Sequence, residues 1–353
     1  MKDGFLRVAA ATPEIKVADP VYNGNEILKL MEEGKKKGAK IMVFPELCLT
    51  GYTCGDLFLQ DTLLENARNE LRRLEEVSKG MDMLVFVGLP FEKGGKLYNT
   101  AAAIQNGQVL AFITKMNIPN YAEFYELRHF NPGPAVPETV LWGNREVPFG
   151  SNILLECGEI PELIVAGEIC EDVWVMDPPS ISHAKAGATV IINCSASDET
   201  TGKHLYRNSL ISGQSARLVC GYVYANAGEG ETTQDLVFGG HNMIAENGTV
   251  LASSRRFENS VIYGDLDLQR IRNERRKMNT FRTEAPGSRY VRVPIHIRRE
   301  ALKLERYIDP APFVPSDGKA RDARCEEILT IQAMGLKKRL AHTGCTHAVV
   351  GIS

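Results

Sequence analysis

The chain has 353 residues, of which 44% are apolar and 24% charged, a profile typical of a soluble globular protein with one large domain and a further segment. The formal net charge of −3 gives no electrostatic reason to expect nucleic acid or an anionic membrane surface as a partner. No run approaches the roughly 20 apolar residues of a membrane-spanning helix, and the start lacks the apolar core of a signal peptide, so we expect no membrane partner.

Short apolar runs that predict strands alternate with amphipathic stretches through about Asp267. The expected strands lie at 6–11, 41–44, 84–89, 153–155, 163–167, 189–194, 221–227 and 261–266. Apolar residues recur at helical spacing between the first two runs, where Gly38 provides the stop, and again at 62–78. The alternation predicts strand–helix units in the first part of the chain.

Two segments predict tight hairpins instead. Their turns are Asn106-Gly107 and Asn247-Gly248, and both residues of an Asn-Gly pair tolerate positive φ. Strand–helix units mixed with antiparallel hairpins predict an α/β layered domain with large mixed sheets.

The character of the chain changes after residue 270. The basic run at 270–282 indicates a solvated helix face rather than a phosphate-binding patch. Prolines at 286, 294, 310, 312 and 315 resist helix and central strand alike, so we expect a proline-rich linker at 271–320. An amphipathic helix ending at Gly344 and the apolar strand AVVGIS follow, and the strand stops so abruptly at Ser353 that the chain looks truncated.

The cysteines and histidines indicate neither cross-links nor metal. The eight cysteines, at 48, 54, 157, 170, 194, 220, 325 and 345, form no CxxC pair, and several lie in apolar runs where buried free thiols are common. HExxH and clustered Cys/His spacings are absent, so we expect no metal site, and GEGETT at Gly228 is no nucleotide fingerprint. A reducing, cytoplasmic location is expected.

Three chemically active side chains each end a predicted apolar run. Cys170 ends ELIVAGEIC, Glu46 follows IMVFP, and Lys115 ends AFITK. A buried structural thiol, an exposed loop carboxylate and a surface lysine are the ordinary alternatives. If the three converge, the carboxylate can take the thiol proton and the lysine can stabilise an oxyanion, as a thiol hydrolase requires. A Cys–His pair has less support, because none of the seven histidines has a distinctive partner motif.

The segments around these residues resemble the nitrilase superfamily of amidases. FPELCLTGY around Glu46, ITKMNIPNYAEFYELRHF around Lys115 and GEICEDVW around Cys170 are similar to its three signature blocks in order and spacing, over roughly residues 4–270. The resemblance implies a nitrilase-like αββα sandwich of two mixed sheets flanked by helices. It also implies carbon–nitrogen hydrolase activity through a Glu-Lys-Cys triad.

A narrower resemblance, to glutamine-dependent NAD+ synthetases, rests on YTCGDLF after Glu46 and on the linker, helix and AVVGIS at the end. It implies a glutaminase domain at 1–270, and at 321–353 the truncated start of an ATP-dependent NAD+ synthetase domain, whose pyrophosphate-binding loop would begin at Ser353. The implied partners are glutamine and a C-terminal synthetase domain of the same parent chain, in a homo-oligomer. No cofactor is implied for the glutaminase domain, whereas ATP and Mg2+ are implied for the synthetase domain.

The resemblance also assigns catalytic roles. Cys170 would attack the side-chain amide of glutamine, and Glu46 would take the thiol proton, pass it to departing ammonia and then activate water. Lys115 would stabilise the oxyanion, and Glu126 matches the second glutamate, which orients the lysine.

Three further residues match positions that hold the α-amino and α-carboxylate groups of glutamine: Tyr121, Ser197 and Lys203. Relatives more often have Arg at the position of Lys203. The lysine keeps the positive charge of that Arg but lacks its bidentate guanidinium fork. From composition alone, all three would be ordinary surface or loop residues.

Two other functions remain open. A stand-alone nitrilase-type amidase or carbamoylase acting on another small amide fits the three blocks but not the linker. A catalytically silent scaffold for assembly fits the fold but not the intact triad.

Overall fold

The computed structural model describes residues 4–233, 235–284, 287–315 and 317–351. The described chain forms two compact units, Met1–Glu305 and Arg306–Ser353. Ser353, the expected start of a pyrophosphate-binding loop, lies outside the described residues. The candidate site lies in the first unit.

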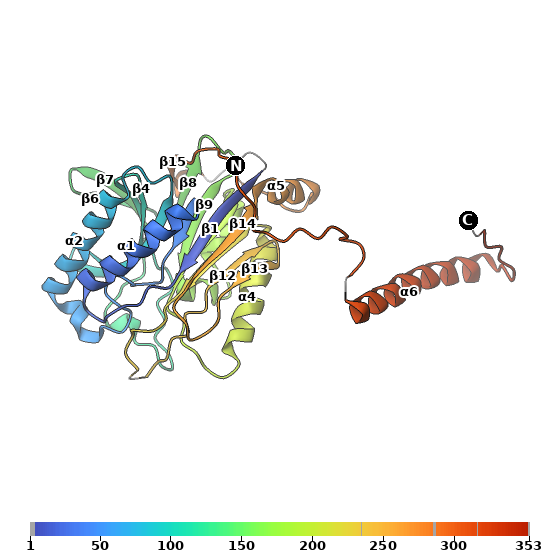
Figure 1. The fold of residues 1–353 in the computed structure, drawn as a ribbon, viewed down its shortest axis with the longest axis horizontal. Coiled ribbons are helices and arrows are strands. Elements are labelled where there is room, and N and C mark those ends of the chain that lie inside the picture. Colours follow the sequence, from blue (N-terminus) through green and yellow to red (C-terminus); the bar gives the residue numbers. More distant parts are fainter. Residues whose placement is uncertain (1–3, 234, 285–286, 316, 352–353) are drawn as a thin grey trace. The chain divides into compact units, whose positions relative to one another are not determined.

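The first unit contains two mixed sheets (Figure 1). The eight-stranded sheet has the order β14-β1-β2-β3-β4-β5-β7-β6. Its strands are β1 (Phe5–Ala11), β2 (Ile41–Val43), β3 (Leu84–Lys93), β4 (Lys96–Gln105), β5 (Gln108–Thr114), β6 (Glu138–Trp142), β7 (Arg145–Phe149) and β14 (Val261–Asp267). The seven-stranded sheet has the order β13-β12-β11-β10-β9-β8-β15. Its strands are β8 (Ile153–Cys157), β9 (Ile164–Ile169), β10 (Val190–Ser195), β11 (Gly221–Asn226), β12 (Met243–Glu246), β13 (Thr249–Ser253) and β15 (Val291–Ile295).

The two sheets pack face to face, with helices on their outer faces. Apolar side chains from both sheets share one buried cluster, which includes Val8, Ile113, Ile169 and Ile192. The helices α1 (Pro20–Lys36) and α2 (Asp61–Val77) cover the eight-stranded sheet, and α3 (Pro179–Lys185) and α4 (Lys203–Leu218) cover the other. This layering confirms the expected αββα sandwich.

Local sequence signals explain the first helix and both hairpins. The side chain of Asp19 caps α1 by accepting from the Tyr22 backbone N–H, and Gly38 follows the helix at φ +75°. At the two predicted turns, all four Asn and Gly residues have positive φ, as tight hairpins require. These turns join β4 to β5 and β12 to β13, so both predicted hairpins form.

The end of the chain differs in part from expectation. Strand β15 lies within the expected linker and forms the edge of the seven-stranded sheet, paired with β8. An edge strand tolerates its proline. The strand buries the side chains of Val293 and Ile295. In the second unit, α6 (Gly318–Thr343) forms where a helix was predicted. The described residues after Thr343 include no strand, so the predicted strand AVVGIS does not form over residues 348–351, and its last two residues lie outside the described ones.

The basic run forms α5 (Leu268–Lys277), whose charged side chains are mostly exposed, as predicted. Arg275 is the exception. It donates to the carbonyl groups of Ala188, Leu218 and Val219, so it holds the end of α4. Among the described residues, no helix is both long enough and apolar enough to cross a membrane.

Candidate active site

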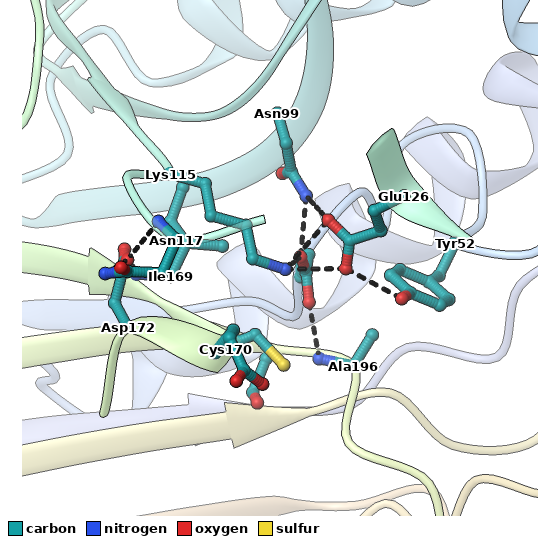
Figure 2. Close-up of polar contacts among 12 residues, drawn as sticks. Tyr52, Asn99, Lys115, Asn117, Glu126, Ile169, Cys170, Asp172 and Ala196 are labelled. Atoms are coloured by element: carbon teal, nitrogen blue, oxygen red, sulfur yellow. Dashed lines mark hydrogen bonds and ion pairs between the residues drawn. The ribbon is translucent and has the colours of Figure 1, made fainter. Parts of the chain in front are cut away.

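Three strand ends bring Glu46, Lys115 and Cys170 together (Figure 2). Glu46 follows β2 and Lys115 follows β5, and both strands run in the same direction within the eight-stranded sheet. Cys170 follows β9 of the facing sheet and begins the 3-10 helix Cys170–Val173. The side chains of all three are buried, so the ordinary alternative of an exposed loop carboxylate and a surface lysine is wrong for Glu46 and Lys115.

Lys115 lies between two carboxylates. Its Nζ donates to Glu46 Oε1 at 2.6 Å and to Glu126 Oε1 and Oε2 at 2.6 and 2.9 Å. The side chains of Lys115 and Glu46 have no exposed surface, and that of Glu126 is 6% exposed. A buried ammonium requires such compensation, because an unpaired charge away from water is very costly.

Three groups that the sequence analysis missed hold the carboxylates in place. Asn99 Nδ2 donates to Glu46 Oε1 at 2.6 Å, and the backbone N–H of Ala196 donates to Glu46 Oε2 at 2.9 Å. The hydroxyl of Tyr52 donates to Glu126 Oε1 at 2.7 Å. Each carboxylate therefore has a donor besides the lysine, which fixes its orientation.

The backbone of Cys170 has an unusual conformation. Its φ is +44°, which non-glycine residues rarely adopt, and its N–H donates to Asn193 Oδ1 at 3.1 Å. Asn193 Nδ2 in turn donates to the hydroxyl of Tyr222, and that hydroxyl donates to Glu168. A buried chain of side chains from the seven-stranded sheet thus supports the turn that presents the thiol.

The charges of the cluster shift its proton equilibria. Burial, opposed by Lys115, raises the pKa of Glu126 to about 7. Burial alone would lower the pKa of Lys115, but Glu126 and Glu46 outweigh it and hold that pKa well above its usual value. Burial and the neighbouring Glu46 raise the pKa of the Cys170 thiol well above its usual range. The resting site therefore holds a charged ammonium and a neutral thiol.

The three predicted binding residues lie close to this cluster but outside its hydrogen bonds. Tyr121 is 56% exposed, and its hydroxyl donates to Glu171 Oε1 at 2.9 Å, next to Cys170. The ammonium of Lys203 pairs with Asp198. The hydroxyl of Ser197 accepts from Arg207 Nη2 at 3.2 Å.

Aromatic rings connect two of these residues. The Lys203 ammonium lies 5.7 Å from the ring centre of Phe124 and 5.6 Å from that of Trp174. The ring of Phe124 is 6.0 Å from that of Tyr121. Phe124 therefore places the tyrosine and the lysine in one neighbourhood, where a small zwitterion could meet both.

A cavity of about 140 Å³ adjoins the Glu126 side of the cluster. Tyr52, Phe124 and Glu126 are among its lining residues, whereas Cys170 is not. The cavity therefore reaches the site from the glutamate side.

Asp172 is another buried polar residue that the sequence analysis did not single out. Its carboxylate accepts from the backbone N–H groups of Met116, Asn117 and Ile169. A carboxylate two residues after the thiol was the available signal, but its partners are distant in sequence.

All eight cysteines are free, and among the described residues no group of three or more His, Cys, Asp and Glu side chains could hold a metal ion.

Comparisons with known proteins show what the chain is similar to. The sequence profile of the carbon–nitrogen hydrolase family matches residues 7–276. A glutamine-dependent NAD(+) synthetase from Mycobacterium bovis is 38% identical over 361 residues, an alignment that covers 99% of this chain and 53% of that protein, in its N-terminal half. The chain thus spans about half the length of the curated relatives it matches.

Solved structures give the same pattern. A glutamine-dependent NAD(+) synthetase from Cytophaga hutchinsonii has a TM-score of 0.67 and 33% identity, with 74% of this chain and 43% of that chain covered. An amidase from Nesterenkonia sp. has a TM-score of 0.59 and 21% identity, covering 78% of this chain and 96% of that chain. At that identity the second likeness concerns the fold alone, and it agrees with the two facing sheets.

Proposed function

The chain belongs to the carbon–nitrogen hydrolase family, and on that premise we propose that it hydrolyses the side-chain amide of glutamine to glutamate and ammonia. The observation that carries this proposal is the buried cluster in which one ammonium lies between Glu46 and Glu126 beside the Cys170 thiol. This cluster combines a base, a nucleophile and a fixed positive charge, the three parts that acyl transfer through a thiol needs.

In the first half-reaction, Cys170 Sγ attacks the amide carbon of glutamine while Glu46 takes the thiol proton. The raised pKa of Cys170 keeps the thiol protonated at rest. The thiolate therefore forms only during the attack, when Glu46 takes the proton. Lys115 stabilises the negative charge on the carbonyl oxygen. Glu46 then returns the proton to the amide nitrogen, the carbon–nitrogen bond breaks, and ammonia leaves a thioester on Cys170.

In the second half-reaction, water attacks the thioester. Glu46 takes a proton from this water, and Lys115 again stabilises the oxyanion. The carbon–sulfur bond breaks, glutamate departs, and the thiol regains its proton from Glu46. Glu126 holds the lysine throughout, since it accepts two hydrogen bonds from Nζ.

The binding of glutamine uses the neighbouring polar groups. Tyr121, Ser197 and Lys203 hold its α-amino and α-carboxylate groups. Lys203 already carries an anionic partner, Asp198, so a substrate carboxylate would share or replace that pairing.

The ammonia is consumed by a synthetase domain that follows in the parent chain and amidates deamido-NAD+ to NAD+ in a homo-oligomer. This extension is supported by the relatives of which the chain covers about half. ATP and Mg2+ serve that second reaction. The hydrolysis described above is assigned only to side chains of this chain.

A stand-alone amidase or carbamoylase acting on another small amide is the second candidate. The cluster of Glu46, Lys115 and Cys170 lies entirely in the first unit, and the chemistry of that cluster suits other small amides as well as glutamine. Initial rates of ammonia release from glutamine and from a panel of small amides distinguish the two, because glutamine must be the preferred substrate of a glutaminase.

The central test is the Cys170→Ala variant. We expect it to keep the wild-type thermal midpoint and to lose ammonia release from glutamine. Labelling with a thiol-reactive glutamine analogue, read by peptide mass spectrometry, should modify Cys170 in the wild type. Unchanged ammonia release by the variant, or no selective labelling of Cys170, contradicts the proposal, and absent labelling would favour a silent scaffold.

A further inference from the structure

Asp172 connects the strand ends that carry Lys115 and Cys170. One carboxylate oxygen, Oδ1, accepts from the backbone N–H of Asn117 at 2.8 Å and from its side-chain Nδ2 at 2.8 Å. The other oxygen, Oδ2, accepts from the backbone N–H of Ile169 at 3.0 Å. The N–H of Met116 reaches both, at 3.2 and 3.4 Å. Figure 2 shows this carboxylate between the two segments.

These donors flank the reacting groups in the sequence. Met116 follows Lys115 directly, and Ile169 directly precedes Cys170. Strand β5, which leads to Lys115, belongs to the eight-stranded sheet, whereas β9, which leads to Cys170, belongs to the facing sheet. No backbone ladder therefore fixes the lysine relative to the thiol, and Asp172 supplies a polar link between the two sheets at this point.

Asp172 is buried and accepts hydrogen bonds at both of its carboxylate oxygens. The residue has no exposed surface, and amide N–H groups surround its charge. Burial raises its pKa, while the hydrogen bonds from Ile169 and Asn117 oppose the rise. Each donor that loses the carboxylate would be left without this acceptor in a setting largely shielded from water, which disfavours the native placement of both segments.

We propose that Asp172 is a positioning residue that sets the placement of the Lys115 ammonium relative to the Cys170 thiol by anchoring both strand ends to one carboxylate. The inference rests on the proposed function, because it assigns Lys115 and Cys170 to one reaction. It requires both oxygens as acceptors, one for each segment. Oδ1 takes the shorter hydrogen bonds from the segment after Lys115, and Oδ2 takes the hydrogen bond from Ile169, so replacing either oxygen with an amino group would set a donor against a donor.

The Asp172→Asn variant tests this requirement, because it keeps the size of the side chain and removes one acceptor. A displacement of about 1 Å between reacting groups can lower a rate by 10²-fold. We therefore expect kcat for glutamine to fall by about 10²-fold and KM to change by less than about 3-fold, since the substrate-holding residues are elsewhere.

A matched control separates positioning from loss of stability. Asp265 is also a buried carboxylate, paired with Arg7 at 2.8 Å near the amino end of β1. Asp265→Asn should lower the thermal midpoint and leave kcat within about 3-fold of the wild type, assayed well below that midpoint. Equal losses of kcat in both variants, or wild-type kcat in Asp172→Asn, would overturn the proposal.

A second measurement keeps the inference separate from the identity of the substrate. The rate at which iodoacetamide alkylates Cys170 depends on the groups around the thiol and needs no glutamine. We expect this rate to fall several-fold in Asp172→Asn and to stay unchanged in Asp265→Asn. If the wild type released no ammonia from glutamine, the proposed function would fail, and the alkylation rates would still decide the role of Asp172.

A milder variant covers the case in which Asp172→Asn does not fold. Asn117→Ala removes one donor to the carboxylate and leaves both oxygens in place. We expect a smaller fall in kcat, about 3- to 10-fold, with KM unchanged. Wild-type kcat in Asn117→Ala, together with an unfolded Asp172→Asn, would reduce Asp172 to a structural residue and reject the positioning role.

Discussion

At the scale of single residues, the site combines two carboxylates with one ammonium. Lys115 can neutralise only one of Glu46 and Glu126, so the cluster carries an excess negative charge while both carboxylates are ionised. Burial is the main cause of the rise in the pKa of Glu126 to about 7 and of the raised pKa of the Cys170 thiol, and the negative charge of Glu46 adds to both. A thiol that stays protonated at rest needs a base during the attack itself, which is the role proposed for Glu46.

A second buried carboxylate, Glu168, allows a prediction about pH and stability. Burial raises its pKa from 4.5 to about 7, although the Tyr222 hydroxyl and the Ser180 N–H oppose the rise. Between pH 4.5 and pH 7 the folded protein keeps the proton of Glu168, whereas the unfolded chain has lost it. The contribution of this group to the free energy of unfolding is therefore fully present below pH 4.5 and is lost as the pH rises through about 7. The loss is at most about 3 kcal/mol.

The Glu168→Gln variant should remove this dependence. We expect its thermal midpoint, relative to that of the wild type, to be higher at pH 8 than at pH 5, because only the wild type must bury a charge at pH 8. Comparing the two proteins at each pH cancels every other titration. A constant difference between the midpoints across this range contradicts the assignment.

The sequence indicates the reacting residues better than the residues that hold them. Cys170 and Lys115 end apolar runs and carry reactive groups, so position and chemistry together single them out. Asn99 and Tyr52 lie in segments whose roles depend on partners far away in the sequence, such as Glu46 and Glu126. Side-chain hydrogen bonds of this kind depend on tertiary packing, which no local pattern records.

At the scale of elements, Gly88 in β3 explains how the loop after β2 reaches its position. A Cβ at Gly88 would lie 2.3 Å from the backbone nitrogen of Leu47 and 2.4 Å from the carbonyl oxygen of Pro45. These are backbone atoms on either side of Glu46, so they cannot rotate away. The close approach of strand and loop therefore requires glycine here.

The Gly88→Ala variant should move Glu46 away from Lys115. We expect a loss of about 1–3 kcal/mol in stability and a fall in kcat of about 10²-fold, measured by thermal unfolding and by ammonia release. Gly213→Ala is the matched control, since a Cβ at Gly213 in α4 meets no atom within 4 Å. The control should be as active as the wild type and slightly more stable. Wild-type turnover in Gly88→Ala would show that the loop tolerates displacement.

Elements with local signals could be predicted, whereas those defined by distant partners could not. The Asn106-Gly107 turn and the end of the first helix at Gly38 depend on the residues at the turn and at the helix end themselves, so the sequence predicts both. Strand β15 does not, because Val291–Ile295 becomes a strand only by pairing with β8, more than a hundred residues earlier. The predicted strand AVVGIS is the opposite case, because its β-favouring residues at 348–351 do not form a strand.

At the scale of the whole molecule, the segment at 291–305 is part of the packed first unit. Val293, Ile295 and Ile297 contribute to the cluster between the sheets. Further along, the Lys303 carbonyl accepts from Arg7 Nη2 at 2.9 Å, and the N–H of Glu305 donates to Asp265 at 2.8 Å. Among the described residues, Ile297 is the last one along the chain that belongs to these apolar clusters, and no residue from 306–353 is a member.

Two truncations test where this unit ends. A chain that stops after Glu305 keeps β15 and the contacts to Arg7, so its thermal midpoint and its ammonia release should match those of the full chain. A chain that stops after residue 283 loses three buried apolar side chains, each worth about 1.5–3 kcal/mol. Its midpoint should fall by many degrees, as measured by circular dichroism during heating. If both truncations lost the same stability, residues 306–353 would have to stabilise the first unit. If neither lost stability, β15 would be dispensable.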